Sequence, residues 1–291
     1  MARGPGAGRL HTGGHLSRPH LVAAAAGRRP GACLQWFLGA HRAGWSAGLC
    51  RRHQLPGGHR VTPTSAHRRR AALLALAAAY VDTCGFIGLF GLFTAHVTGN
   101  FVLIGAELVN HHDQILTKLL ALPIFLVSVL LTAQVEFVLQ RRGKPATAWL
   151  LGAEALFIAA AAFAAGRLPA PGRPDDLATM SLGFTLIAAM GVQNALMRTS
   201  LAGPVQTTVM TGNVTQTAID LLALAAGRAD ASARTRIYNA WPAILAFAAG
   251  SALGAAGYAW VGFDCLWLAA VLVVAAALVV SGQTEKVTSG A

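Results

Sequence analysis

The sequence predicts an all-α, polytopic membrane protein, a helix bundle that spans the bilayer, on three observations. Hydrophobic residues make up 55% of the 291 residues and charged residues only 12%, whereas an ordinary soluble chain has about 25% charged residues. The mean hydropathy is +0.53. From residue 71 onward, apolar stretches approach or reach the roughly 20 residues that a helix needs to cross a bilayer. This composition excludes a coiled coil, a disulfide-stapled secreted module and a typical cytosolic enzyme.

The N-terminal segment, residues 1–70, differs from the rest. It holds twelve Arg and no Lys, Asp or Glu, so the formal charge of +12 is confined to it. We expect disorder, because Gly, Pro and Ala leave it little apolar surface to offset the entropy of ordering. It could be an arm for anionic lipid or nucleic acid, a targeting peptide, or an upstream extension with the true start at Val61. We expect no nucleic-acid partner, because no nucleic-acid-binding motif is present.

The membrane domain is expected to be residues 71–281, followed by a short polar tail, residues 282–291. Its six clear apolar stretches are Ala71–Phe93, Lys118–Leu139, Thr147–Ala165, Leu177–Leu196, Tyr238–Trp260 and Cys265–Ser281. Two further segments, Thr94–Val109 and Pro204–Ala225, carry many polar residues. The sequence therefore allows six or eight spans.

The distribution of positive charge favours six spans over eight. Arg68, Arg69 and Arg70 precede the first span, which places that end in the cytoplasm. If the two polar segments do not cross, the cluster Arg141–Lys144 is cytoplasmic too, and both termini lie in the cytoplasm of a bacterial cell. If both segments cross, this cluster moves outside, which the positive-inside rule disfavours.

The tripeptide Thr98-Gly99-Asn100 recurs 113 residues later as Thr211-Gly212-Asn213, and the same offset relates Glu107 to Asp220. A polar pair precedes each tripeptide: Val81-Asp82 in the first case and Gln193-Asn194 in the second. We expect two related halves, residues 71–165 and 177–281. Three spans per half would invert the second copy in the membrane, as in many secondary transporters; four would make the repeats parallel. In both cases we expect the two polar segments to pack against each other.

Gly interrupts a helix at low steric cost, and Thr and Asn are good N-cap residues. We therefore expect one helix to start near Thr98 or Asn100 and another near Thr211 or Asn213. Irregular backbone at membrane depth is tolerated where it lines a wet cavity or is buried in protein. Close helix packing through small residues is the competing explanation.

Acidic residues inside a membrane are costly and often functional. Asp82 lies in the middle of the first span, and His96 could exchange protons with it. Glu136 and Glu154 are expected near helix ends, paired with Arg141, Arg142 or water. The four Cys (Cys33, Cys50, Cys84 and Cys265) form no CxxC pair, so we expect no metal site, disulfide framework or cofactor.

Two long motifs carry a resemblance to a known family. The stretch from Tyr80-Val81-Asp82 to Thr98-Gly99-Asn100-Phe101 resembles the first signature of the YoaK-like family of bacterial multi-pass membrane proteins. The stretch from Gly191-Val192-Gln193-Asn194 to Thr211-Gly212-Asn213-Val214-Thr215 resembles the second. The resemblance covers about residues 71–281. It implies an integral membrane protein and supplies no substrate, because the family is a domain of unknown function.

Our leading hypothesis is a secondary transporter or permease for a small polar or anionic solute, with proton coupling an open option. Its expected pathway residues are Asp82, His96, Thr98, Gly99, Asn100, Glu107, Gln193, Asn194, Thr211, Gly212, Asn213 and Asp220. The alternative is a membrane protein without transport, acting as a structural, sensing or assembly partner. We expect no enzyme, because HExxH and P-loop motifs are absent from the sequence. The expected partners are the lipid bilayer and a solute that the sequence does not name; the oligomeric state stays open.

Overall fold

The computed structural model describes residues 65–110, 115–203 and 205–289. The expectations for residues 1–64, including the start at Val61, lie outside these ranges. Helices account for all the regular structure of the described residues, as expected. They are α1 (Ser65–Gly88), α2 (Gly99–Asn110), α3 (Ile115–Arg141), α4 (Ala146–Ala165), α5 (Leu177–Leu196), α6 (Met210–Ala225), α7 (Ala233–Val261), the short 3₁₀ helix η1 (Gly262–Cys265) and α8 (Leu266–Ser289).

Five apolar helical stretches within the described ranges are long enough to cross a membrane. The last of them, Ala233–Gly282, is 50 residues long and contains two helices, α7 and α8. The chain turns between them at Gly262, whose φ of 62° favours glycine. The long helices of the described part are therefore α1, α3, α4, α5, α7 and α8. The helices α2 and α6, with 12 and 16 residues, measure about 18 and 24 Å and fall short of a bilayer core of about 30 Å.

Helix α1 begins at Ser65, six residues before the expected start at Ala71. The arginine-rich turn continues the helix, because its side chains find partners there. Arg68 donates to the hydroxyl of Tyr238 on α7 (3.0 Å) and lies over the same ring, 4.1 Å from its centre. The boundary between the basic segment and the membrane domain therefore falls within a helix.

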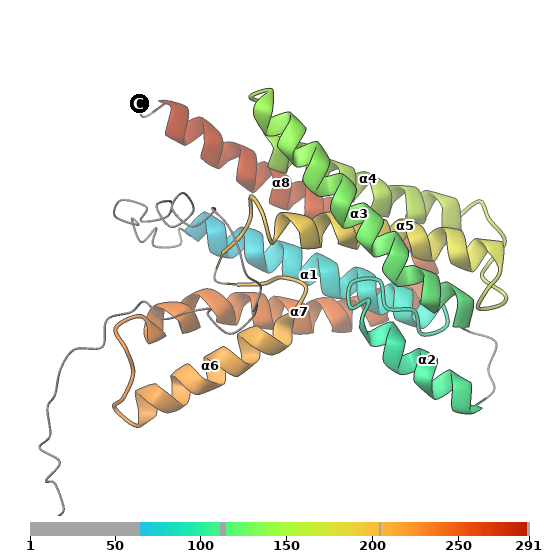
Figure 1. Ribbon diagram of the computed structural model, residues 1–291, viewed down its shortest axis with the longest axis horizontal. Coiled ribbons are helices and arrows are strands. Elements are labelled where there is room, and N and C mark those ends of the chain that lie inside the picture. The colour runs from blue at the N-terminus through green and yellow to red at the C-terminus, as the bar shows by residue number, and fades with distance from the viewer. Residues whose placement is uncertain (1–64, 111–114, 204, 290–291) are drawn as a thin grey trace, which may run out of the picture. The chain divides into compact units, whose positions relative to one another are not determined.

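The packing of the helices centres on α1, which contacts α7 along most of its length and also packs against α8 (Figure 1). On the other side of the core, α4 packs against α5 and α8, and α3 against α5. Two glycines of α7 lie directly on the backbone of α1. A Cβ built on Gly250 would lie 2.3 Å from the carbonyl oxygen of Leu76, and one on Gly254 would lie 2.6 Å from that of Tyr80. This small-residue contact brings the two helices close together.

The two short helices lie apart. Among the helices, α2 contacts only α3, and α6 contacts only α7; Figure 1 shows them at opposite ends of α1 and α7. The expectation that the two Thr-Gly-Asn segments pack against each other is therefore wrong for the helices that carry them. The loops that precede these helices reach into the core: Leu89 and Leu92 of the first loop (residues 89–98) and Met197 and Leu201 of the second loop (described over 197–203 and 205–209) belong to the buried core cluster.

Candidate functional site

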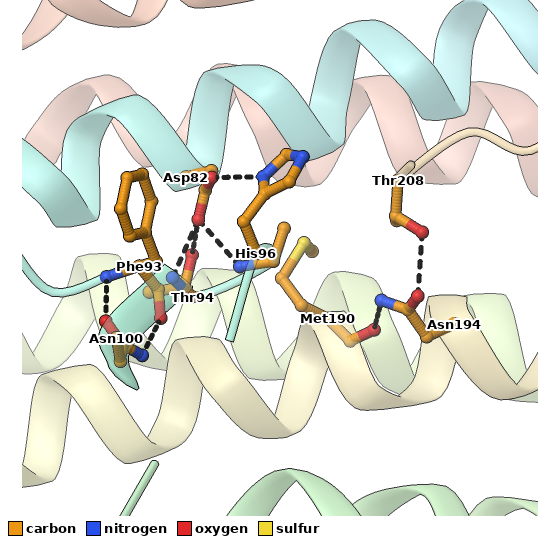
Figure 2. Close-up of polar contacts among 9 residues, drawn as sticks. Asp82, Phe93, Thr94, His96, Asn100, Met190, Asn194 and Thr208 are labelled. Atoms are coloured by element: carbon orange, nitrogen blue, oxygen red, sulfur yellow. Dashed lines mark hydrogen bonds and ion pairs between the residues drawn. The ribbon is translucent and has the colours of Figure 1, made fainter. Parts of the chain in front are cut away.

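The first loop is held by a single carboxylate, Asp82, in the last third of α1. Its Oδ1 accepts hydrogen bonds from the backbone N–H groups of Thr94 and Ala95, each at 2.7 Å, and from Thr94 Oγ1 at 3.2 Å. Its Oδ2 lies 2.7 Å from Nδ1 of His96 (Figure 2). Asp82 is buried. These bonds replace the hydration that the carboxylate loses on burial, and they fold the loop back along its own helix.

His96 connects this buried carboxylate with less buried surroundings. Its side chain is 35% exposed, against 8% for that of Asp82. The ring packs edge-on against Phe247 of α7, with 5.6 Å between the ring centres. In Figure 2 its second nitrogen faces away from Asp82. An imidazole in this position can take up a proton on one nitrogen while the carboxylate stabilises the resulting charge at the other.

A second polar contact closes the first loop at its far end. Asn100, in the first turn of α2, accepts a hydrogen bond from the backbone N–H of Phe93 and donates one to the carbonyl of the same residue, both at 2.9 Å. Asn213, in the first turn of α6, makes the same pair of contacts with Gln206. Its Oδ1 accepts from the backbone N–H at 3.4 Å, and its Nδ2 donates to the carbonyl at 2.6 Å. We call this double contact, with a residue seven positions upstream, the asparagine clamp.

The second loop is held by the polar pair at the end of α5. Gln193 donates to Thr207 Oγ1 at 2.8 Å and to the carbonyl of Leu74 on α1 at 3.1 Å. Asn194 accepts a hydrogen bond from Thr208 Oγ1 at 2.7 Å. Gln193 and Asn194 of α5 thus hold the second loop by hydrogen bonds, as Asp82 holds the first loop.

Figure 2 shows the first loop bonded to Asp82 of α1 and the second loop bonded to Asn194 of α5, and each loop also reaches the other of these two helices. The first loop reaches α5 at Gly183, where an added Cβ would lie 2.5 Å from a methyl carbon of Leu92. The second loop reaches α1 at Gly203, where an added Cβ would lie 2.9 Å from Cε1 of His67. Irregular backbone thus lies against two long helices, held by hydrogen bonds at residues 93–96 of the first loop and 206–208 of the second.

Of each tripeptide, only the asparagine is buried. Thr98, Thr211 and Gly212 are exposed, and Gly99 is partly exposed. The helices do begin at Gly99 and Met210, within one residue of the expected starts. The expected capping role is wrong for α6, whose N-cap residue is Val209 with no side-chain cap bond. Asn213 instead bonds to the loop before the helix.

The acids of the short helices are neutralised by bases that the sequence analysis did not identify. Glu107 of α2 pairs with Lys118, which also donates to the carbonyl of Phe90 at 2.9 Å. Asp220 of α6 pairs with Arg236, with distances of 2.5 and 2.8 Å. Lys118 and Arg236 are each the fourth residue of the next long helix. Each short helix is therefore tethered to the helix that follows it.

The two remaining intramembrane acids differ from expectation. Glu136 accepts hydrogen bonds from Thr199 Oγ1 at 2.5 Å and from Gln140 at 3.0 Å, so the expected pairing with Arg141 or Arg142 is wrong. Glu154 is the ninth residue of the 20-residue helix α4, about 12 Å from its start and not near an end. It is completely buried, and neither of its oxygens has a partner in the described part of the chain.

Two cavities lie at opposite ends of the long helices. One, of about 420 Å³, is bordered by the polar side chains of Glu136, Gln140, Thr199 and Ser200. The other, of about 300 Å³, lies between the ends of α1, α4 and α7 and is bordered by Tyr258 and Asp264. Neither of these two cavities includes a residue of the tripeptides.

One family comparison gives a result. The family described as protein of unknown function (DUF1275) matches residues 70–279, which include almost all of the helices described above. No curated protein and no solved structure is detectably similar to the chain. Because the match covers more than half of the sequence, this chain, whose own apolar helices are long enough to cross a membrane, belongs to that family of unknown function.

Proposed function

We propose that the protein is a secondary transporter for a small polar or anionic solute, coupled to protons through Asp82 and His96. The observation that carries this proposal is the pair of polar loops between α1 and α5, each closed by an asparagine clamp. Secondary transporters bind solutes at interrupted segments of this kind, where free backbone groups are available near the middle of the membrane.

We also propose that α1–α4 and α5–α8 are an inverted repeat. Three matches support it: the asparagine clamps, the tethers from Glu107 to Lys118 and from Asp220 to Arg236, and the helix contacts. The contact of α1 with α7 matches that of α5 with α3, and the contact of α1 with α8 matches that of α5 with α4. Each half has three long helices, so the second copy is inverted, and the opposite ends at which α2 and α6 lie agree with that.

In the proposed cycle, His96 takes up a proton on the nitrogen that faces away from Asp82. The carboxylate stabilises the imidazolium through the other nitrogen. A change in charge at this pair alters the hydrogen bonds that hold Thr94 and Ala95, and so couples protonation to the position of the first loop. The polar groups of Gln193, Asn194, Thr207 and Thr208 offer contacts to a polar solute.

We propose, from the positive-inside rule, that the arginine-rich start of α1 lies in the cytoplasm of a bacterial cell and that six spans bring the C-terminus back to the same side. We keep the resemblance to the YoaK-like family and the absence of enzymatic activity as predictions.

Uptake into proteoliposomes tests the proposal. A panel of small polar and anionic solutes is offered to the wild type with and without an inward proton gradient. We expect gradient-dependent uptake of at least one solute, loss of it in Asp82→Asn, and retention in Asp264→Asn, which changes an exposed acid in η1. Absence of uptake for the whole panel, or wild-type uptake by Asp82→Asn, contradicts the proposal.

The second candidate is a membrane protein that transports nothing and acts as a structural, sensing or assembly partner. It is favoured by the local character of the Asp82 contacts, all of which lie within 14 residues of it. A carboxylate with only local contacts can stabilise the fold without any part in transport. Co-purification of one partner in stoichiometric amount, together with no uptake, distinguishes this candidate from the transporter.

A further inference from the structure

Glu154 is the one acid among the described residues whose two carboxyl oxygens are both buried and both without a hydrogen-bond partner. It lies on the face of α4 that points into the main core. The neighbours above and below it on this face, Leu150, Leu151 and Ile158, are all buried and belong to the core cluster. The carboxyl group is therefore surrounded by apolar side chains near the middle of a membrane-length helix.

Within the described part of the chain, no cation bonds to Glu154 from the elements packed against α4. Over Leu177–Leu196 of α5 and Leu266–Gly282 of α8, the sequence contains no ionisable side chain. On η1, Asp264 is exposed and Cys265 lies beside Cys84. On α3, Lys118 is bonded to Glu107, Glu136 to Thr199 and Gln140, and Arg141 stacks on Phe137.

These surroundings fix the state of the group. A carboxylate without a counter-ion or a hydrogen bond is very unfavourable in an apolar interior, so the group is held as the neutral acid. A neutral acid without a partner is itself destabilising compared with an apolar side chain of similar size. A residue with this cost at the centre of a membrane domain points to a role that an apolar residue does not provide.

We propose that Glu154 is a second proton-binding site, distinct from Asp82 and His96, whose ligand is the proton itself. In the packed arrangement described here the site is loaded and closed. When α4 moves relative to α5 and α8, water reaches the carboxyl group, the O–H bond breaks, and the proton passes to water while water hydrates the carboxylate. Return to the packed arrangement requires that the carboxylate takes up a proton again. This inference rests on the proposed transport function for its role in a cycle, and on the burial of Glu154 for its chemistry.

Infrared difference spectroscopy on the protein in lipid vesicles tests the chemistry directly. The C=O stretch of a neutral carboxylic acid without hydrogen bonds absorbs at higher frequency than that of a hydrogen-bonded acid and is well separated from that of a carboxylate. At neutral pH we expect this band in the wild type, its loss in Glu154→Gln, and its retention in Glu136→Gln. The latter changes a buried acid that is hydrogen-bonded. In D₂O we expect the band to shift as the proton exchanges.

Three outcomes overturn the proposal: absence of the band, retention of the band in Glu154→Gln, and a band that stays unshifted in D₂O while the fold is intact. Gln replaces a neutral acid with a neutral group of the same shape, so this variant is expected to fold. Glu154→Asp provides a second check, because it should keep an exchangeable acid band at an altered frequency.

The same variants separate this inference from the proposed function. If the band is present and exchanges but no solute uptake responds to a proton gradient, the site stands and the transport proposal fails. If uptake responds to the gradient equally in the wild type and in Glu154→Gln, transport stands and the role of Glu154 in it fails. We expect Glu154→Gln to lose the stimulation by the gradient and to keep solute exchange at equal pH on both sides.

Discussion

The close contact of α7 with α1 predicts that replacing Gly250 with alanine lowers the stability of the protein. In Gly250→Ala the new Cβ would lie 2.3 Å from the carbonyl oxygen of Leu76 and 3.0 Å from two further backbone atoms of that residue. An ordinary contact needs about 3.4 Å, so the helices must separate by about 1 Å. Backbone atoms cannot turn away as a side chain can. Overpacking of this kind costs typically 1–3 kcal/mol, and we expect the upper end here.

The higher helix propensity of Ala offsets up to about 1 kcal/mol of this cost. The net loss in the free energy of unfolding for Gly250→Ala is therefore about 2 kcal/mol. Gly152→Ala on α4 is the matched control, because nothing lies within 4 Å of its Cβ and the helix gains about 0.5–1 kcal/mol. Unfolding midpoints measured in one detergent should therefore move in opposite directions for the two variants. If Gly250→Ala is as stable as Gly152→Ala, the helices do not approach as described.

Three other predictions concern stability in the same assay. Asn100→Ala and Asn213→Ala each remove an asparagine clamp and leave partly buried backbone groups of Phe93 or Gln206 unpaired, so each should lose about 1–2 kcal/mol. Thr98→Ala and Thr211→Ala, at exposed positions, should change stability by less than about 0.5 kcal/mol. Equal losses in all four variants would argue against the clamps. Glu154→Leu should raise stability by about 1–3 kcal/mol, because it removes an unpartnered polar group from the core; a loss would mean that the carboxyl group has a partner. Asp176 accepts a hydrogen bond from the backbone N–H of Thr179 at the start of α5, and this bond lowers the pKa of its carboxyl from 3.8 to about 2. The contribution of this cap, about 1 kcal/mol, is therefore complete above pH 5 and is lost as the pH falls through the folded-state pKa. Wild type and Asp176→Ala should differ at pH 6 and converge near pH 2, whereas a constant difference across this range would contradict the cap.

The long helices and the starts of the short ones follow from local signals, since apolar length and the glycine of each Thr-Gly-Asn tripeptide act within a few residues. What each buried polar group contacts could not be inferred in the same way. Lys118 of α3 and Arg236 of α7 reach the short helices α2 and α6 because the chain turns back between each short helix and the long helix that follows it. Glu154 lies in a helix that is apolar on every side, so no periodicity indicates which face enters the core. The same limit applies to the asparagine clamps, whose partners lie in loops without a sequence pattern.

The expectation that the two tripeptides meet failed for a related reason. An internal repeat indicates that two segments resemble each other, and it does not specify their separation. The two proposed halves meet instead through α1 with α7, α4 with α8 and α5 with α3, and glycines allow the backbones to approach in the first and last of these contacts. The loops before the short helices, not the helices, then enter the region between α1 and α5.

The arrangement of α2 and α6 can be measured without knowledge of the solute. Single cysteines are placed at Val109 near the end of α2 and at Arg228 after α6, both exposed, in a protein whose four native cysteines are replaced by alanine. A thiol reagent that does not cross membranes is then applied to intact cells and to inverted membrane vesicles. Two inverted halves with short helices that return to the face they entered from predict labelling of Val109→Cys from outside and of Arg228→Cys from the cytoplasmic side. Labelling of both from the cytoplasmic side would mean that α2 and α6 cross the membrane, and would contradict the account of two loops that enter from opposite faces.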